Sequence, residues 1–121
     1  MFKDKVVIVT GGASGIGRCI ADEFRKQGAV VYVIDKQEGD HFVGDIARQE
    51  VLEAFAAEVL GQHAQVDVIV NNALPLMRGI DECSYEEFQY ALSVGVTAPF
   101  YLVKLLKAHL AEGASIINIS S

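Results

Sequence analysis

The sequence predicts an α/β fold in which a mostly parallel, doubly wound sheet carries helices on both faces. Short runs of β-branched and apolar residues alternate along the chain with longer segments whose apolar residues repeat at helical spacing. The strand-like runs are almost continuously apolar, which is typical of strands covered on both faces. A glycine-rich turn joins the first run to the first helical segment. This alternation favours parallel strands joined by right-handed crossovers.

Each element has its own local signal. Strands are expected over residues 5–10, 29–34, 41–43, 66–70 and 114–119, of which the third is weak. Helices are expected over residues 16–27 and 48–60, with Gly28 and Gly61 as their C-terminal caps. Ser84 and Glu87 have capping-box spacing and predict the start of another helix. A long apolar segment then predicts a separate helix over residues 96–110.

Composition limits the classes of function. With 121 residues, of which 51% are hydrophobic and 21% charged, the chain is expected to form one globular domain or part of one. Ten basic and 16 acidic residues give a net charge of −6, and no basic block occurs. This charge argues against binding to nucleic acid or to an anionic membrane. No apolar run approaches the roughly 18 residues of a membrane span, and no secretory signal is recognisable, so a cytoplasmic location is expected.

Metal-binding patterns do not occur in the sequence. The histidines His41, His63 and His109 are scattered, and Cys19 and Cys83 form no CxxC pair. Neither spacing is that of a zinc site or a disulfide framework, so we expect no metal.

The glycine-rich turn, TGGASGIG over residues 10–17, points to a nucleotide. Glycine lets the backbone adopt positive φ and lets a pyrophosphate approach without a Cβ in the way. The N–H groups and the dipole of the following helix then meet the phosphate charge. Asp35 ends the next strand, 35 − 17 = 18 residues after Gly17, close to the spacing of the acid that binds the adenosine ribose. The alternative is a purely structural turn.

Four motifs, in order, resemble those of the short-chain dehydrogenase/reductase family. TGGASGIG is similar to the family's TGxxxGIG turn, and Gly44-Asp45-Ile46 is similar to its adenine-contacting segment. Asn71-Asn72-Ala73 resembles the start of its NNAG motif, and residues 117–121 resemble the segment that carries the catalytic serine. The resemblance implies a Rossmann-type sheet with strand order 3-2-1-4-5.

The resemblance also implies a role for individual residues. Ser121 would be the catalytic serine that holds and polarises a substrate carbonyl. The residues implied in cofactor binding are Gly11, Ser14, Gly15, Ile16 and Gly17 at the pyrophosphate, Asp35 and Lys36 at the ribose, Asp45 and Ile46 at the adenine, and Asn72 and Ala73 along the adenosine. Two alternatives stay open: Asp45 as a helix-start acid, and Asn71-Asn72 as a turn that satisfies its own backbone.

The sequence departs from the family pattern in three places. Leu74 stands where the family usually has glycine, and Gly95 stands where it often has asparagine. The family's catalytic Tyr-x-x-x-Lys pair, expected about a dozen residues beyond the serine, has no counterpart in the 121 residues. We therefore expect residues 1–121 to be a dinucleotide-binding domain truncated after its fifth strand. It would lack the family's C-terminal strands and helices, and alone it would be inactive.

The expected function is that of an NAD-dependent oxidoreductase that transfers hydride between nicotinamide and a small carbonyl or alcohol. NAD is expected rather than NADP, because Asp35 would repel a 2′-phosphate. The alternative is a non-catalytic NAD-binding module or fragment. The helix expected over residues 96–110 is apolar over more than one stripe, which predicts a second apolar contact besides the sheet. The family resemblance implies that this contact is helix pairing between subunits, in a homodimer or homotetramer. The alternative is that the family's C-terminal half covers this face.

Overall fold

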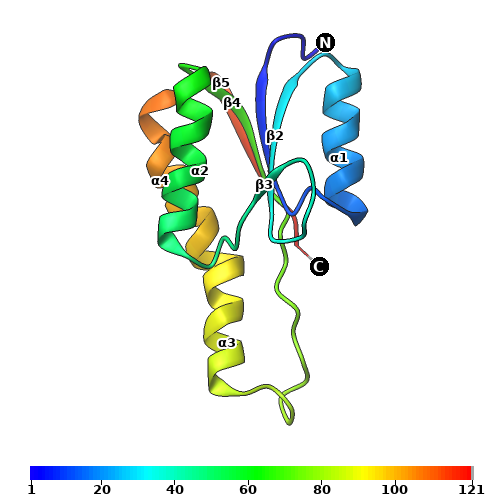
Figure 1. Cartoon of the computed structure of the whole chain (residues 1–121), viewed down its shortest axis with the longest axis vertical. Coiled ribbons are helices and arrows are strands. Elements are labelled where there is room, and N and C mark those ends of the chain that lie inside the picture. Colours follow the sequence, from blue (N-terminus) through cyan, green and yellow to red (C-terminus); the bar gives the residue numbers. More distant parts are fainter. Residues whose placement is uncertain (121) are drawn as a thin grey trace.

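The computed structural model describes residues 1–120 and contains one parallel five-stranded sheet of order β3-β2-β1-β4-β5 (Figure 1). The strands are β1 (Val6–Thr10), β2 (Val30–Asp35), β3 (Phe42–Val43), β4 (Val66–Asn71) and β5 (Leu110–Asn118). All of the strand pairs are parallel. The predicted α/β class and strand order are confirmed.

Helices cover both faces of this sheet. In Figure 1, α1 (Gly15–Lys26) lies on one side, and α2 (Gln49–Gln62) and α4 (Ala98–Leu106) lie side by side on the other. Residues of β1 alternate between the faces and are buried along the whole strand. One core lies between the sheet and the pair α2 and α4, and includes Ile8, Phe55, Val59, Leu102 and Leu106. A smaller core lies under α1, and includes Val7, Val9, Ala21 and Val70.

The prediction of a separate helix over residues 96–110 was wrong. Helix α3 (Tyr85–Leu92) continues through a π-helical turn, Ser93–Thr97, into α4 and a final 3₁₀ turn, Lys107–His109. Gly95 lies inside the π-helical turn and does not break the helix. A π-helical turn inserts into an α-helix without ending it, and a helical glycine costs only about 1 kcal/mol relative to alanine. The predicted capping box at Ser84 and Glu87 is confirmed.

The two predicted glycine caps have different outcomes. Gly28 follows α1 with φ +90°, and the Ala29 N–H group donates to the Phe24 carbonyl, so this cap is confirmed. The cap at Gly61 was wrong, because α2 continues through Gly61 to Gln62 and ends at His63. Unlike Gly28, Gly61 does not adopt the positive φ of a glycine cap, and a glycine inside a helix costs only about 1 kcal/mol relative to alanine.

Strand β5 begins earlier than predicted and lies at the edge of the sheet. Leu110 pairs with Val66, and Ser115 pairs with Val68, so the chain between them forms an irregularity that contains Gly113 at φ +79°. A bulge of this kind adds residues that no alternating pattern reveals. Along β5 the side chains of Ile116 and Ile117 remain exposed, and an apolar cleft of about 480 Å³ separates Ile117 from α1.

The continuous helical stretch Tyr85–His109 has 25 residues and a mean hydropathy of 1.3 in its most apolar window, enough by length and composition alone to cross a membrane. No such span was expected from the apolar runs. The finding is weak evidence for a membrane, since core helices of soluble proteins pass the same test. In this stretch Leu102 and Leu106 are fully buried in the core, while 28% of its apolar 18-residue segment as a whole is buried inside the protein.

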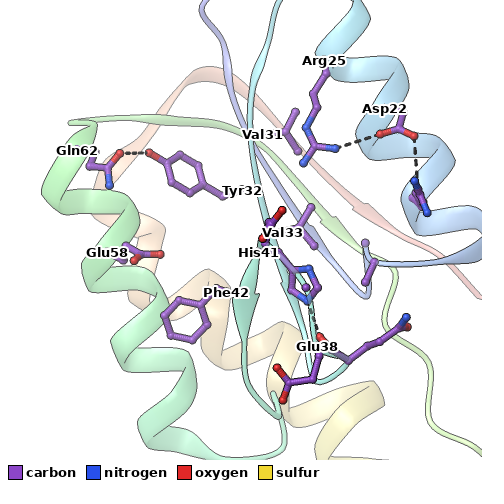
Figure 2. Close-up of a pocket in the computed structure, with 16 residues that line it drawn as sticks. Asp22, Arg25, Val31, Tyr32, Val33, Glu38, His41, Phe42, Glu58 and Gln62 are labelled. Atoms are coloured by element: carbon purple, nitrogen blue, oxygen red, sulfur yellow. Dashed lines mark hydrogen bonds and ion pairs between the residues drawn. The ribbon is translucent and has the colours of Figure 1, made fainter.

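A wide cleft lies along the outer edge of β2, where residues 36–41 join two parallel strands without a helix (Figure 2). Parallel neighbours usually need a crossover of about a dozen residues or more. Because β3 pairs only with Ile34 and Asp35, the rest of this edge is left uncovered. The cleft has a volume of about 960 Å³ and is lined by α1, α2, β2, Gly12 and Ala13 of the glycine turn, and residues 37–42. None of the predicted cofactor residues lines it.

Candidate cofactor site

A second cleft, of about 680 Å³, lies at the carboxyl end of the parallel strands. This is the end of an open α/β sheet where ligands bind. Its wall includes the predicted residues Gly11, Ser14, Ile16, Asp35, Lys36, Asp45, Ile46, Asn72 and Ala73. Gly15 and Gly17 lie in the same turn but do not line the cleft, and Ser121 lies outside the described residues. The fold thus brings together segments that are far apart in the sequence.

Each glycine of the turn has its own steric setting. Gly11 has φ +66°, and a Cβ there would lie 2.9 Å from the Ala73 Cα atom. Gly15 has φ +56°, and a Cβ there would meet nothing within 4 Å. A Cβ on Gly17 would lie 2.9 Å from the Gly11 carbonyl carbon, and closer still to the Gly11 oxygen and to Nδ2 of Asn72. The turn is therefore closed toward β4 at Gly17 and open at Gly15.

Thr10, at the end of β1, and Asn72, directly after β4, join the glycine turn to the end of β4. Nδ2 of Asn72 donates to the Gly11 carbonyl oxygen at 3.0 Å. The Thr10 Oγ1 atom accepts from the backbone N–H groups of Asn72 and Ala73, each at 3.1 Å. Thr10 is 2% exposed, so these bonds are shielded from water. Asn72, which the family resemblance assigns to the adenosine, thus also supports the glycine turn, and Thr10, the first residue of the motif, joins this turn to the end of β4.

The N-terminus of α1 faces this cleft without a neutralising group of its own. Ser14 is the N-cap residue, but its side chain makes no capping hydrogen bond, and the first turn contains no acidic residue. The first N–H groups of a helix have no partner within the helix and carry its positive dipole end. This arrangement provides N–H donors and positive potential at the position where the sequence predicts a pyrophosphate.

Asp35 links the end of β2 to the glycine turn. Its Oδ2 atom accepts from the Ala13 N–H group at 3.1 Å, and its Oδ1 atom accepts from the Gln37 N–H group at 3.0 Å. A carboxylate has about four acceptor positions, so room remains for the hydroxyl groups of a ribose. Asp35 therefore orders the turn and offers a free acceptor at the rim of the cleft.

Tyr90 of α3 is a residue of this cleft that sequence reasoning missed. Its hydroxyl group donates to Asp45 Oδ2 at 2.7 Å, and the Lys36 ammonium group donates to the Tyr90 oxygen at 3.4 Å. The other carboxylate oxygen of Asp45 accepts from the Ala47 N–H group at 2.9 Å. Asp45 thus both shapes the chain before α2 and faces the cleft. No sequence motif identifies Tyr90, because its contact with Asp45 depends on where the fold places α3.

The charge of the cleft is predominantly negative. Among its described lining residues, Asp35, Asp45, Glu86 and Glu87 are acidic, and Lys36 is the only cation. Burial raises the pKa of Tyr90 above its ordinary value of 10.0, the hydrogen bond and charge of Asp45 raise it further, and Lys36 acts in the opposite direction. The hydroxyl group is therefore protonated at neutral pH and remains a donor to Asp45.

Two departures from the family pattern meet at one place. Leu74, Pro75 and Leu76 line the cleft in the segment after β4, which projects with α3 beyond the carboxyl end of the sheet (Figure 1). A Cβ on Gly95 would lie 3.6 Å from Pro75 Cδ, an ordinary contact. The π-helical turn at Gly95 therefore packs beside the segment that contains Leu74 and Pro75, and the backbone at Gly95 has room for a side chain.

The strand that leads to Ser121 is joined to β4 by side chains as well as by its backbone. Nδ2 of Asn71 donates to Asn118 Oδ1 at 2.9 Å, and the Ile119 N–H group donates to the Asn71 carbonyl oxygen at 3.0 Å. Within residues 1–120, Oδ1 of Asn71 is the one buried side-chain oxygen or nitrogen atom without a hydrogen-bond partner. Asn71 thus holds β5, rather than satisfying only its own turn.

Known proteins resemble the chain in both sequence and fold. The sequence model of the short chain dehydrogenase family matches residues 5–121. L-fucose dehydrogenase of Mus musculus is 35% identical over 135 residues, covering 99% of this chain and 50% of the mouse protein. The 3-ketoacyl-(acyl-carrier-protein) reductase from Brucella melitensis, solved with NADH, has a TM-score of 0.88 and 26% identity, covering 100% of this chain and 58% of its own.

A blue fluorescent protein from a metagenomic library, solved in complex with NADPH, has a TM-score of 0.89 and 25% identity, covering 99% of this chain and 57% of its own. The chain spans about half the length of the curated relatives that it matches first. The motifs occur in family order, the sheet has the order expected for them, and the family match extends over nearly the whole chain. The chain belongs to the short-chain dehydrogenase family, and relatives of this kind are oxidoreductases.

Proposed function

We propose that the protein is an NAD-dependent oxidoreductase of the short-chain dehydrogenase type that transfers a hydride between nicotinamide and a small carbonyl or alcohol. The observation that carries the proposal is a single cleft that joins the glycine turn, Asp35 and Asp45. The residues fit a dinucleotide, because Gly15 leaves open space beside the helix N-terminus and Asp35 keeps free acceptor positions. When bound, the nicotinamide would supply or accept the hydride.

The proposal of NAD over NADP is supported by the charge of the cleft. A 2′-phosphate would enter beside Asp35, in a wall that contains further carboxylates and Lys36 as its only described cation. Like charges in a partly enclosed cleft repel more strongly than in open water. The NADH and NADPH complexes among the similar structures allow either cofactor, so the preference of this chain rests on its own side chains.

Catalysis is proposed for the whole protein, with Ser121 holding and polarising the substrate oxygen. A serine hydroxyl has too high a pKa to exchange the substrate proton, so the reaction needs a separate acid/base group. The family resemblance suggests that this group would be the tyrosine of a Tyr-x-x-x-Lys pair in the whole protein. A protein that binds the dinucleotide and performs no hydride transfer would instead be a binding module.

A homodimer or homotetramer is proposed from the outer face of the α3–α4 stretch. Phe88, Leu92, Val96 and Phe100 follow one another at four-residue spacing and are 40% to 63% exposed. Residues at this spacing lie on one helical face, and contiguous apolar surface commonly marks an interface between subunits. The absence of nucleic-acid and anionic-membrane partners is proposed from the net charge of −6.

The first experiment titrates NAD and NADP separately into the protein and into the Asp35→Ala variant. We expect NAD to bind more tightly than NADP, and Asp35→Ala to weaken NAD binding by about 1–3 kcal/mol, the contribution of hydrogen bonds to a charged group. Tighter binding of NADP by the unmutated protein would contradict the cofactor proposal.

The second experiment measures NADH formation and oxidation by the full reading frame. Because relatives carry the names L-fucose dehydrogenase, galactose dehydrogenase and 3β-hydroxysteroid dehydrogenase, the substrate panel should include L-fucose, D-galactose, hydroxysteroids and small ketones. Ser121→Ala should then lower kcat far more than NAD affinity, since its proposed partner is the substrate oxygen. Undiminished kcat in this variant would remove Ser121 from the mechanism.

A further inference from the structure

We propose that Tyr90 is a specificity-determining residue of the cofactor cleft: its hydroxyl group holds Lys36 toward Asp45 and so keeps the cleft's cation from a 2′-phosphate. This inference rests on the proposed binding of a nicotinamide dinucleotide and adds a residue that no cofactor motif contains. It assigns the discrimination between NAD and NADP to a helix across the cleft, in addition to Asp35.

The geometry forms a chain of three polar groups. The Lys36 ammonium group donates to the Tyr90 oxygen at 3.4 Å, and the Tyr90 hydroxyl group donates to Asp45 Oδ2 at 2.7 Å. The same ammonium group lies 5.4 Å from the centroid of the Tyr90 ring, within cation–π range. Lys36 therefore has two attractive contacts with one side chain, and both draw it toward α3.

The position of Lys36 makes this restraint relevant to the ribose. Lys36 directly follows Asp35, the acid at the carboxyl end of β2, and both line the cleft. A 2′-phosphate at this strand end would meet the Asp35 carboxylate, and only a cation could offset that repulsion. Lys36 is the only cation among the described residues that line this cleft, so a phosphate that pairs with Lys36 competes with Tyr90 for it.

A different role for Tyr90 is separable from this one. If its hydroxyl group only stabilised Asp45, its loss would change the adenine end of the site, which NAD and NADP share. Release of Lys36 would instead favour only the nucleotide that carries the additional phosphate. The ratio of the NADP and NAD dissociation constants therefore reports on Lys36 and cancels effects common to both nucleotides.

The experiment measures dissociation constants of NAD and NADP by calorimetry for the unmutated protein, Tyr90→Phe, Lys36→Met and the double variant. Tyr90→Phe keeps the ring and removes the hydroxyl group. We expect it to lower the NADP-to-NAD ratio of dissociation constants by about two- to fivefold, the size of an exposed charge interaction. In the Lys36→Met background the same change should leave the ratio unaltered, since interacting residues are non-additive.

Tyr85→Phe is the matched control, because Tyr85 lies on the same helix, is 77% exposed and does not line the cleft. It should leave the ratio unchanged. The inference is overturned if Tyr90→Phe leaves the ratio unchanged, or if its effect persists without Lys36. A protein that binds neither nucleotide overturns the proposed function and this inference together, whereas binding with an unaltered ratio overturns the inference alone.

Discussion

Substituting Gly17 by alanine should destabilise the protein and weaken NAD binding, because the structure has no space for a Cβ at this position. The new methyl group would overlap the Gly11 carbonyl group and the Asn72 amide. Relief of the overlap must separate Nδ2 of Asn72 from the Gly11 oxygen, which are now hydrogen-bonded at 3.0 Å. The substitution thus disturbs the glycine turn at the point where β4 supports it.

The magnitude follows from two contributions. Overpacking of a well-packed site costs about 1–3 kcal/mol, and loss of one hydrogen bond costs about 0.5–1.5 kcal/mol. Together they predict a decrease of about 1.5–4.5 kcal/mol in the free energy of unfolding. Since the displaced Gly11 carbonyl belongs to the turn that would hold the pyrophosphate, NAD affinity should decrease by about tenfold or more, equivalent to at least about 1.4 kcal/mol.

Urea denaturation followed by circular dichroism measures the stability, and calorimetric titration with NAD measures the affinity. Gly61→Ala is the matched control, because a Cβ there would meet nothing within 4 Å and the residue lies inside α2. That variant should gain up to about 1 kcal/mol from helix propensity and bind NAD normally. If Gly17→Ala unfolds at the same urea concentration as the unmutated protein and binds NAD equally well, the steric reasoning is refuted.

Three further predictions concern stability. Thr10→Val should lower the free energy of unfolding by about 2–4 kcal/mol, because two shielded N–H groups lose their acceptor. Thr10→Ser keeps the hydroxyl group and should largely retain stability. Equal urea midpoints for the two variants would contradict this prediction. Gly95→Ala should raise the thermal midpoint, since its Cβ would meet only Pro75 at 3.6 Å and glycine costs about 1 kcal/mol in a helix; a lower midpoint in calorimetry would refute it. Burial raises the pKa of Tyr32 and of Tyr90 above 10.0. The stability that these neutral hydroxyl groups contribute is therefore complete below pH 10 and is lost as the pH rises through the folded-state pKa. Urea midpoints that stay constant from about pH 9 to pH 12 would argue against this prediction.

Local patterns in the sequence predicted most of the fold. The continuously apolar runs indicated strands buried on both faces, and β1 is buried at every position. The capping box at Ser84 and the cap at Gly28 were predicted correctly because each depends on a few consecutive residues. The carboxyl ends of parallel strands lie at one edge of the sheet, so the strand order also explains why the glycine turn and Asp35 share a cleft.

Other features were decided by tertiary structure. Contacts with distant segments outweigh local propensities of about 1 kcal/mol. They explain three features: α3 and α4 are continuous through Gly95, α2 continues through Gly61, and β5 starts earlier than predicted. The Tyr90 hydroxyl group bonds Asp45, 45 positions away in the sequence. At Gly17 no side chain fits, because Asn72 lies too close. The sequence alone thus determined which segments become strands and helices and which motifs meet at the strand ends. Steric exclusion and hydrogen bonding between segments, which act through space and leave no periodic trace along the chain, decided the rest.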